Sequence, residues 1–226
     1  MLRQQLPILI NTACPDFDPW ILIDRAEAHG LSIIPSQDGP LSIVTQGADP
    51  RDLSRQTIKF GWHKDGLYRP ALPQLVFLHC QNPGRGDIQT KLGDACTAAS
   101  SLAKNMPLDL REFALIYEGK NGGLFPRPLI EAHSRTGQLT VNVSQRAVIA
   151  RPDSPEDRQA AAAESRNMME QIEGYLDAAC IYTQTWRAGD LLIFDNEHFA
   201  HARIGSRPDP ARRLHRIWFS IESGTP

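Results

Sequence analysis

The C-terminal third of the chain consists of short strand-like segments separated by turns, and this pattern restricts the fold most. The segments read YTQTW, DLLIFD, FAHARIG and RRLHRIWFSIE. In the last of them alternate positions differ in character, which is typical of a barrel wall with distinct inner and outer faces. Many short strands with a few helices outside them predict a mixed α and β protein, mainly β, with a double-sheet jelly-roll core.

Helix signals interrupt the strands at a few places. Asp18 and Pro19 begin one predicted helix and Gly30 follows its end, the usual asymmetry of helix termini. Asp94 caps a second, the segment LDLREFALIYEG predicts a third, and a long helix begins at Ser154 and runs to about Ala179. Elsewhere the sequence predicts a loop at GKNGGLFPRP, a hairpin around RTGQ, and strands at LPILI, LSIIP, LSIVT and QLVFLHCQN.

Length and composition exclude several classes of protein. The 226 residues suit a single domain, with 1–56 as an N-terminal α/β extension packing on a core of 57–221. The net charge of −2 without a basic stripe argues against nucleic acid as a partner. No segment reaches the roughly 18 apolar residues of a membrane span. We therefore expect a small-molecule ligand, and a homo-oligomer is compatible with the sequence.

The four cysteines are scattered and form no Cys-x-x-Cys pair. This distribution argues against a thiolate zinc site and against a disulfide framework. It fits a reducing compartment, so we expect a cytoplasmic protein. The N-terminus also lacks the apolar stretch and the cleavage site of a signal peptide.

The segment WHKDG carries the first candidate for chemistry. His63 and Asp65 are two residues apart, so on a strand they project from the same face. With His201 as a third ligand they would form the two-histidine, one-carboxylate triad of non-haem Fe(II) oxygenases, which leaves positions open for substrates. The alternative interpretation is that HKD is a solvated turn, because such tripeptides are common.

The strand RRLHRIWFSIE carries the second candidate. Arg212, Leu214, Arg216 and Trp218 share one face, and two arginines beside Leu and Trp suit the wall of an apolar cavity that binds an anion. The guanidinium stays charged and can grip a carboxylate through two hydrogen bonds. The alternative is an exposed basic edge strand that resists aggregation.

Taken together, WHKDG, GDLLIFDNEHFAHAR and RRLHRIWF resemble the taurine dioxygenase/clavaminate synthase-like family of Fe(II)- and 2-oxoglutarate-dependent oxygenases. RPLIEAHSRTGQLTVNV is similar to the central segment of that family. The resemblance covers about residues 57 to 221 and implies a distorted double-stranded β-helix. It also implies Fe(II) as the metal, 2-oxoglutarate as the cosubstrate and O2 as the oxidant.

The resemblance assigns roles residue by residue. His63 and Asp65 match the first two iron ligands, and His201 matches the third, because the family spaces it D-N-x-x-x-x-H after an Asp-Asn turn. His198 does not fit that spacing and is left with a supporting, substrate or plain turn role. Arg212 matches the arginine that binds the distal carboxylate of 2-oxoglutarate, and Arg216 matches one that supports the cosubstrate or contacts an acidic substrate.

Two parts of the expected site depend on weaker signals. The Gly-rich turn GRGDIQT has Ile88 where the family often carries a cosubstrate-binding Thr, so we expect Thr90, two residues on, to replace it. Trp62, Tyr68 and Arg69, with the loop NGGLFPRP, are the predicted substrate-binding wall or lid. Core packing of Trp62 and solvation of Arg69 are the competing interpretations.

The implied reaction is hydroxylation of a small carboxylate- or amino-acid-like metabolite with release of succinate and CO2. The carboxylate of Asp65 favours hydroxylation, because related halogenases lack it so that chloride can bind. Desaturation or cyclisation of a biosynthetic intermediate, free or carrier-bound, is the alternative within this class. Outside it, the same ligands would suit a Zn or Mn cupin-like hydrolase or isomerase. A non-catalytic binding or sensor protein on the same fold is the other alternative, and the presence of all three ligands argues against it.

Overall fold

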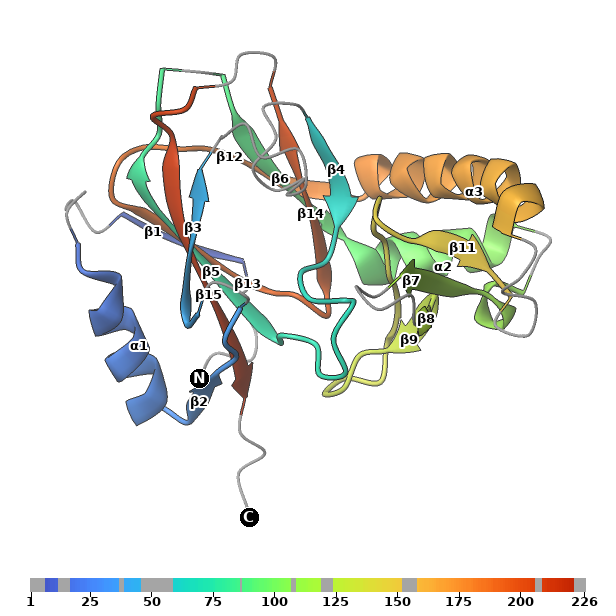
Figure 1. Cartoon of the computed structure of the whole chain (residues 1–226), viewed down its shortest axis with the longest axis horizontal. Coiled ribbons are helices and arrows are strands. Elements are labelled where there is room, and N and C mark those ends of the chain that lie inside the picture. The colour runs from blue at the N-terminus through green and yellow to red at the C-terminus, as the bar shows by residue number, and fades with distance from the viewer. Residues whose placement is uncertain are drawn as a thin grey trace.

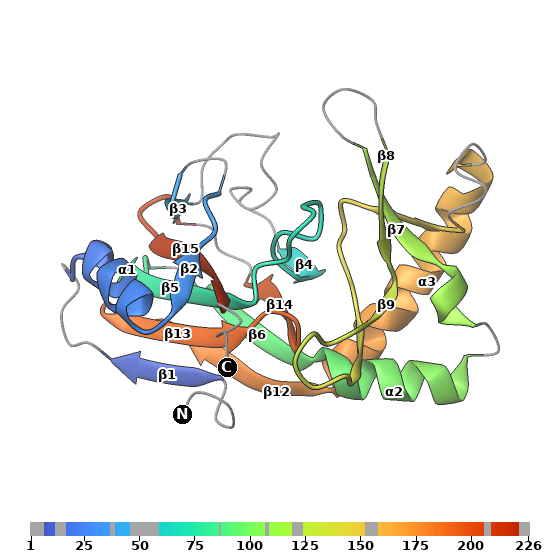
Figure 2. The ribbon, with the colours of Figure 1, turned by 90° about the horizontal axis from the view of Figure 1, so that it is seen from below.

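The computed structural model describes residues 7–11, 17–36, 39–45, 59–85, 87–106, 109–118, 124–151, 158–205 and 209–221. Within these ranges strands predominate over helices, as the sequence predicts. Figure 1 shows α1 at one end of the molecule and α2 with α3 at the other end, and Figure 2 shows the same separation from below.

Six strands form the larger sheet, and they come from both ends of the chain. Their order is β1–β13–β5–β15–β2, and β3 also pairs with β15. In chain order the strands are β1 (Ile8–Asn11), β2 (Leu31–Ile33), β3 (Leu41–Thr45), β5 (Leu75–Asn82), β13 (Asp190–Asp195) and β15 (Arg213–Ile221). The strands predicted near residues 6–10, 31–35 and 41–45 therefore exist, and they extend the sheet that the C-terminal strands form.

A second sheet of four strands lies beside the first (Figure 1) and has the order β12–β6–β14–β4. Its strands are β4 (Phe60–His63), β6 (Gln89–Asp94), β12 (Cys180–Thr185) and β14 (Phe199–Ile204). All pairs in this sheet are antiparallel.

Side chains that alternate along the strands build two separate cores. On β5, β13 and β15 one set of side chains packs with residues of the four-stranded sheet, namely Val76, Leu78, Leu192, Phe194, Leu214 and Trp218. The intervening set packs against α1 (Pro19–Ala28), namely Leu75, Phe77, Leu191, Ile193, Ile217 and Phe219. Period-2 alternation therefore gives each central strand two buried faces.

A third core lies at the far end of the molecule, around α2 (Ala95–Asn105) and α3 (Arg158–Ala178). Small sheets cover these helices in Figure 1: β11–β7–β8, and the hairpin β9–β10. Their strands are β7 (Ala114–Glu118), β8 (Leu124–Pro128), β9 (Ile130–Ala132), β10 (Leu139–Val141) and β11 (Val148–Ala150). The hairpin is the one predicted around RTGQ, and Asp94 caps α2 as expected.

The helix predicted from LDLREFALIYEG is wrong. Only a short 3-10 turn, η2 (Leu110–Glu112), precedes β7. Phe113, Leu115 and Tyr117 enter the core of α2 and α3, whereas Ala114 and Ile116 pack against Ala150 on the opposite face. Burial on both faces of an extended segment overrides its local helical propensity.

The loop predicted at GKNGGLFPRP is partly wrong, because Leu124–Pro128 forms β8 and pairs with β7. Residues 119–123 and the predicted start of the long helix at Ser154 lie outside the described residues. Among the helices that the structure describes, none is both long and apolar enough to cross a membrane.

Candidate functional site

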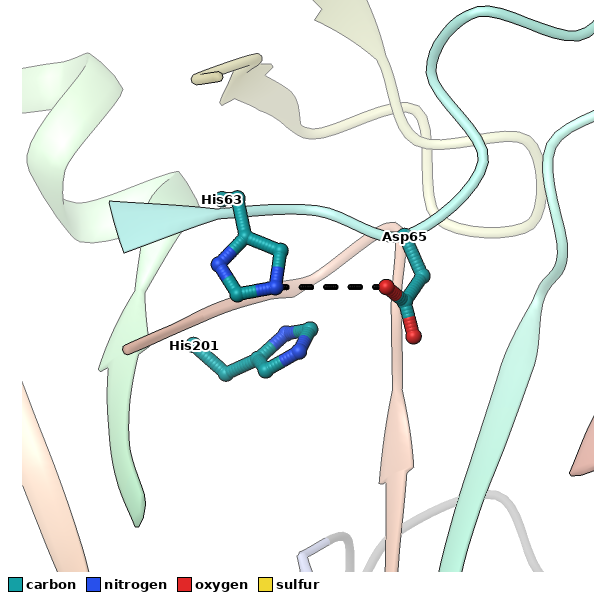
Figure 3. A group of neighbouring side chains, drawn as sticks. All are labelled: His63, Asp65 and His201. Carbon is teal, nitrogen blue, oxygen red and sulfur yellow. Dashed lines mark ion pairs between the residues drawn. The ribbon is translucent and has the colours of Figure 1, made fainter. Parts of the chain in front are cut away.

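Two histidines meet where β4 pairs with β14. The antiparallel register places His201 directly opposite His63, and the ring centroids are 4.0 Å apart. Figure 3 shows the two imidazoles beside Asp65, which comes from the turn after β4. One ligand atom from each of the three residues lies within 4.8 Å of the other two, and all three side chains are buried.

Asp65 reaches this group through a turn and not through strand alternation, because β4 ends at His63. Gly66 follows with φ at +73°, and a Cβ there would lie 2.5 Å from the ring of Pro73. Only glycine adopts this backbone with no steric cost. The Gly66 turn therefore directs the Asp65 carboxylate back towards the histidines.

The side chain of Asn196 holds that turn in place. Its Oδ1 accepts a hydrogen bond from the backbone N–H of Asp65 at 2.9 Å, and its Nδ2 donates to the carbonyls of Asp65 and Pro73, each at 2.9 Å. Asn196 is fully buried, so these bonds have no competition from water. The Asp-Asn turn ahead of His201 thus fixes the backbone that carries the carboxylate.

The protonation states of the three residues suit a divalent metal ion. His63 donates from Nδ1 to the Gly61 carbonyl at 2.9 Å, which leaves the lone pair on Nε2, 3.9 Å from Asp65 Oδ1. Burial lowers the pKa of both His63 and His201, so each imidazole is neutral and able to coordinate. The buried Nδ1 of His201 has no hydrogen-bond partner.

Asp65 is ionised although it is buried. Burial opposes ionisation, but the charge of the Arg216 guanidinium outweighs it and lowers the pKa of Asp65 to about 2. Arg216 Nη1 lies 3.1 Å from Asp65 Oδ1, and the Trp218 indole N–H donates to Oδ2 at 2.9 Å. Two neutral nitrogens and one carboxylate oxygen are the donor set of a non-haem iron site.

A cavity between the two sheets opens from the histidines and ends at buried cations. His63, His201 and Thr90 line it from the four-stranded sheet, and Arg212 and Arg216 line it from the side of β15. Arg203 lines the same cavity, and Val44, Phe60, Leu78 and Leu214 make its apolar wall. The cavity therefore combines apolar walls with a concentrated positive charge.

Arg212 is the most unusual residue of that wall. Its side chain is 1% exposed, yet its Nε and Nη1 have no hydrogen-bond partner. Burial, and then the charge of Arg203, lower its pKa to about 10, so the guanidinium remains charged at neutral pH. A buried cation with unused donors requires an anionic partner, because an unpaired charge in a buried site is costly.

Thr90 stands beside this cation. The indole N–H of Trp186 donates to Thr90 Oγ1 at 3.0 Å. Because that bond uses an acceptor site of the hydroxyl, the O–H itself remains able to donate into the cavity. Ile88, which occupies the position where the family often carries Thr, is buried elsewhere and does not line the cavity.

The predicted substrate-binding residues do not lie together in the structure. Tyr68 lies near Asp65 and Arg216, and burial raises the pKa of its hydroxyl. Arg69 lies with its guanidinium 5.7 Å from the Trp218 ring. Trp62 instead projects from the opposite face of β4 to His63 and packs in the core around α2 and α3, so the competing core interpretation describes it.

His198 is not part of the His63 and Asp65 group. Its imidazole lies between Asp94 and Cys96 at the start of α2. Sequence reasoning missed Arg203, which lines the cavity with Arg212. The signal was present, because Arg203 is two residues after His201 and strand alternation puts both on one face.

Comparison with known proteins identifies the class. The family model described as "Taurine catabolism dioxygenase TauD, TfdA family" matches residues 20–218, so the chain belongs to this family. It is therefore an Fe(II)- and 2-oxoglutarate-dependent oxygenase that uses O2. The match begins well before residue 57, where the sequence resemblance was expected to start. No curated protein sequence matches the chain significantly.

Solved structures share the fold at low identity. AAD-2 in complex with Mn(II) and N-oxalylglycine is 16% identical with a TM-score of 0.63, over 79% of this chain and 68% of that chain. A taurine dioxygenase from Burkholderia xenovorans is 16% identical with a TM-score of 0.62, over 89% and 72%. PvcB, an Fe, alpha-ketoglutarate dependent oxygenase from an isonitrile synthetic pathway, is 17% identical with a TM-score of 0.53, over 90% and 80%.

The bonds of Asn196 predict a combined effect on stability and metal binding. We expect Asn196→Ala to lower the free energy of unfolding by about 1–3 kcal/mol, because buried backbone groups lose their partners. It should also weaken Mn(II) binding, since the turn that carries Asp65 is released. Chemical denaturation and titration calorimetry measure the two effects. Asn167→Ala, on the exposed surface of α3, is the control and should change neither.

Proposed function

We propose that the protein hydroxylates a small carboxylate- or amino-acid-like metabolite and releases succinate and CO2 from 2-oxoglutarate. The observation that carries this proposal is the convergence of His63, Asp65 and His201, together with a cavity that the two histidines line with Arg212, a buried guanidinium whose Nε and Nη1 have no hydrogen-bond partner. Desaturation or cyclisation of a biosynthetic intermediate uses the same cofactors and is the alternative outcome.

In this proposal the two facing sheets are the halves of a distorted double-stranded β-helix, and the whole chain is one oxygenase domain. His63, Asp65 and His201 hold the iron. When bound with 2-oxoglutarate, the iron supplies oxidation of a C–H bond by O2. The fit rests on the two neutral imidazoles, the ionised carboxylate and the unpaired buried Nδ1 of His201.

Arg212 and Thr90 bind the distal carboxylate of 2-oxoglutarate. The guanidinium has two unused donor groups, and the Thr90 hydroxyl has its proton free for a third hydrogen bond. Because the walls are apolar and water is largely excluded, the pairing of opposite charges counts for more than it does in water. Arg203 on the same wall strengthens the positive potential.

Arg216 has a positioning role in addition to any contact with substrate. It pairs with Asp65 and lies 4.7 Å from the Trp218 ring, so it is fixed between a metal ligand and an aromatic face. In this position it keeps the Asp65 carboxylate ionised and oriented. Tyr68 lies close enough to interact electrostatically with Arg216, and its hydroxyl is the group proposed to contact a polar substrate.

The substrate class is inferred from a second, larger cavity of about 590 Å³ next to Arg69. Arg69 supplies positive charge to its wall and Glu197 supplies negative charge, while Arg127 and Glu131 form an ion pair with each other at 3.1 Å. A wall with both signs of charge suits a zwitterion such as an amino acid, because each ionic group finds an opposite partner. Ile34 and Leu72 add an apolar surface for a side chain.

The iron site is tested by anaerobic spectroscopy of protein mixed with Fe(II) and 2-oxoglutarate. We expect a weak visible charge-transfer band that disappears in His63→Ala and in His201→Ala. The band should survive in His198→Ala, because the His198 side chain contacts Asp94 and Cys96 and is not one of the proposed iron ligands. A band that persists without His201 would refute the ligand assignment.

The cosubstrate site is tested by 2-oxoglutarate affinity in Arg212→Gln. We expect binding to weaken about 10- to 100-fold, the effect of losing a charge-assisted pair of hydrogen bonds. The free energy of unfolding should stay level or rise, since the variant removes an unpaired buried charge. Arg213→Gln, at the exposed residue that follows Arg212, is the matched control and should bind normally.

The substrate class is tested by a screen of amino acids, small carboxylates and sulfonates with coupled detection of succinate. We expect turnover with at least one amino acid, and a KM about tenfold higher in Arg69→Gln with kcat preserved. Arg166→Gln, exposed on α3, is the control. Succinate formation stimulated only by substrates without a carboxylate would contradict the proposed substrate class.

A further inference from the structure

A second group of reactive side chains lies at the start of α2, separate from the candidate iron ligands. Cys96 is in the first turn of the helix and Asp94 is its N-cap. His198, from the turn between β13 and β14, lies between them. Its Nδ1 is 3.5 Å from Cys96 Sγ, and its Nε2 is 3.3 Å from Asp94 Oδ1.

The backbone fixes this group, which we call the Cys96 relay (Asp94, His198 and Cys96). The N–H of Ala95 donates to the His198 carbonyl at 2.9 Å, and Phe199 pairs with Asp94 across β14 and β6. Asp94 Oδ1 accepts from the N–H of Cys96 and Thr97, each at 2.9 Å. These contacts fix the backbone of His198, and rotation of the Asp94 carboxylate would break its two hydrogen bonds to the start of α2.

The order of contacts points to thiol activation. The two nitrogens of one imidazole face different partners, thiol on one side and carboxylate on the other. A thiol, imidazole and carboxylate in this order form the arrangement of an activated nucleophile. One ligand atom from each of the three residues also lies within 4.8 Å of the other two, so a metal ion would compete for the same thiol, and the tests below use metal-free protein.

Two sources of positive charge face the thiol. The hydrogen bonds to Asp94 and then to Cys96 raise the pKa of His198 to about 10, so its imidazolium faces the sulfur. The positive end of α2 adds to this, since Cys96 is in the first turn. The other titratable groups nearby are Lys64, which interacts with Cys96, and His133, whose ring is 6.2 Å from His198 and is held by Asp195 and Glu197.

Solvent and small reagents have limited access to the Cys96 relay. Cys96 as a whole is 7% exposed, while the His198 and Asp94 side chains are 27% and 22% exposed, so solvent meets the relay from their side. A small oxidant or alkylating agent fits this setting better than a macromolecule does. Neither the candidate iron site nor the cavity of Arg212 includes any member of the relay.

We propose that Cys96 is a nucleophilic thiol, activated by His198 and Asp94, that hydrogen peroxide oxidises reversibly to a sulfenic acid. The sulfur attacks one peroxide oxygen, so an S–O bond forms and the O–O bond breaks. The sulfur loses two electrons, and the departing hydroxide takes a proton from the imidazolium to leave as water. A thiol reductant restores Cys96.

The first test measures alkylation by iodoacetamide, cysteine by cysteine, by mass spectrometry of the metal-free full chain. At pH 6.5 we expect Cys96 to react at least about tenfold faster than Cys180, a half-buried thiol beside the Tyr182 carbonyl. His198→Gln should remove that advantage and make the rate at position 96 rise with pH as for an ordinary thiol. Equal rates at Cys96 and Cys180 in the wild-type protein would overturn the proposal.

A second variant separates the loss of thiol activation from an effect of misfolding. Asp94→Asn keeps an acceptor oxygen for the helix cap but loses the charge that holds His198, and we expect a smaller loss of Cys96 reactivity than in His198→Gln. Cys80 is fully buried, so it stays unlabelled as long as the fold is intact. If His198→Gln exposes Cys80 to labelling, that variant has lost its fold. The comparison of Cys96 with Cys180 in the wild-type protein, together with Asp94→Asn, then decides whether Cys96 is activated.

The second test treats metal-free protein with hydrogen peroxide and traps sulfenic acid with dimedone. We expect an adduct at Cys96 that dithiothreitol prevents and that His198→Gln reduces about tenfold. Adducts of equal yield at Cys180, or none at Cys96, would overturn the proposal. Because neither test needs iron or 2-oxoglutarate, the outcome is independent of the proposed oxygenase reaction.

Discussion

The pairing of β14 with β4 is the constraint on which the site depends. It sets His201 opposite His63 in an antiparallel register, and a slip of one residue would turn one imidazole to the far face of the sheet. The next pair on these strands is already irregular. Other contacts therefore have to secure the register. The Asn196 side chain does so, because it lies in the turn between β13 and β14 and forms hydrogen bonds with the backbone of Asp65 and Pro73.

The two sheets supply different residues of the candidate site. The four-stranded sheet and its adjoining turn supply the three candidate ligands, whereas β15 of the six-stranded sheet supplies Arg216, and Arg212 lies directly before β15. Arg216 joins the two halves through its contact with Asp65. The distance between the candidate metal ligands and Arg212, the proposed cosubstrate anchor, is thus set by how the sheets pack, that is, by the apolar residues between them.

Much of this arrangement could be predicted from the sequence, because the strands of the C-terminal third alternate cleanly and the ligand spacing is distinctive. The alternation of β15 correctly separated Arg212, Leu214 and Trp218 from Ile217 and Phe219. For Asp65, the argument from alternation reached the right neighbours by the wrong route, since the residue lies in a turn whose direction depends on Gly66 and Asn196. That contact is remote in sequence and has no local signal.

The predictions that were wrong also depended on contacts between residues that are remote in sequence. The segment around Phe113 and Leu115 has good local helix propensity, but its burial from two sides depends on α3 and β11, which no window of sequence contains. Trp62 and His63 are adjacent, so a strand assigns them to opposite faces, and only the position of α2 and α3 shows which face is core. The partners of His198, Asp94 and Cys96, precede it by about half the chain.

The wide separation of His63 and His201 along the polypeptide has a consequence for assembly. In an unfolded chain these imidazoles rarely meet, so the candidate metal site exists only after β4 and β14 have paired. Metal capture therefore reports completed folding, and free metal ions shift the balance between native and denatured molecules by mass action. A destabilised variant would lose its ion as it opens, and supplying more of the ion would partly rescue it.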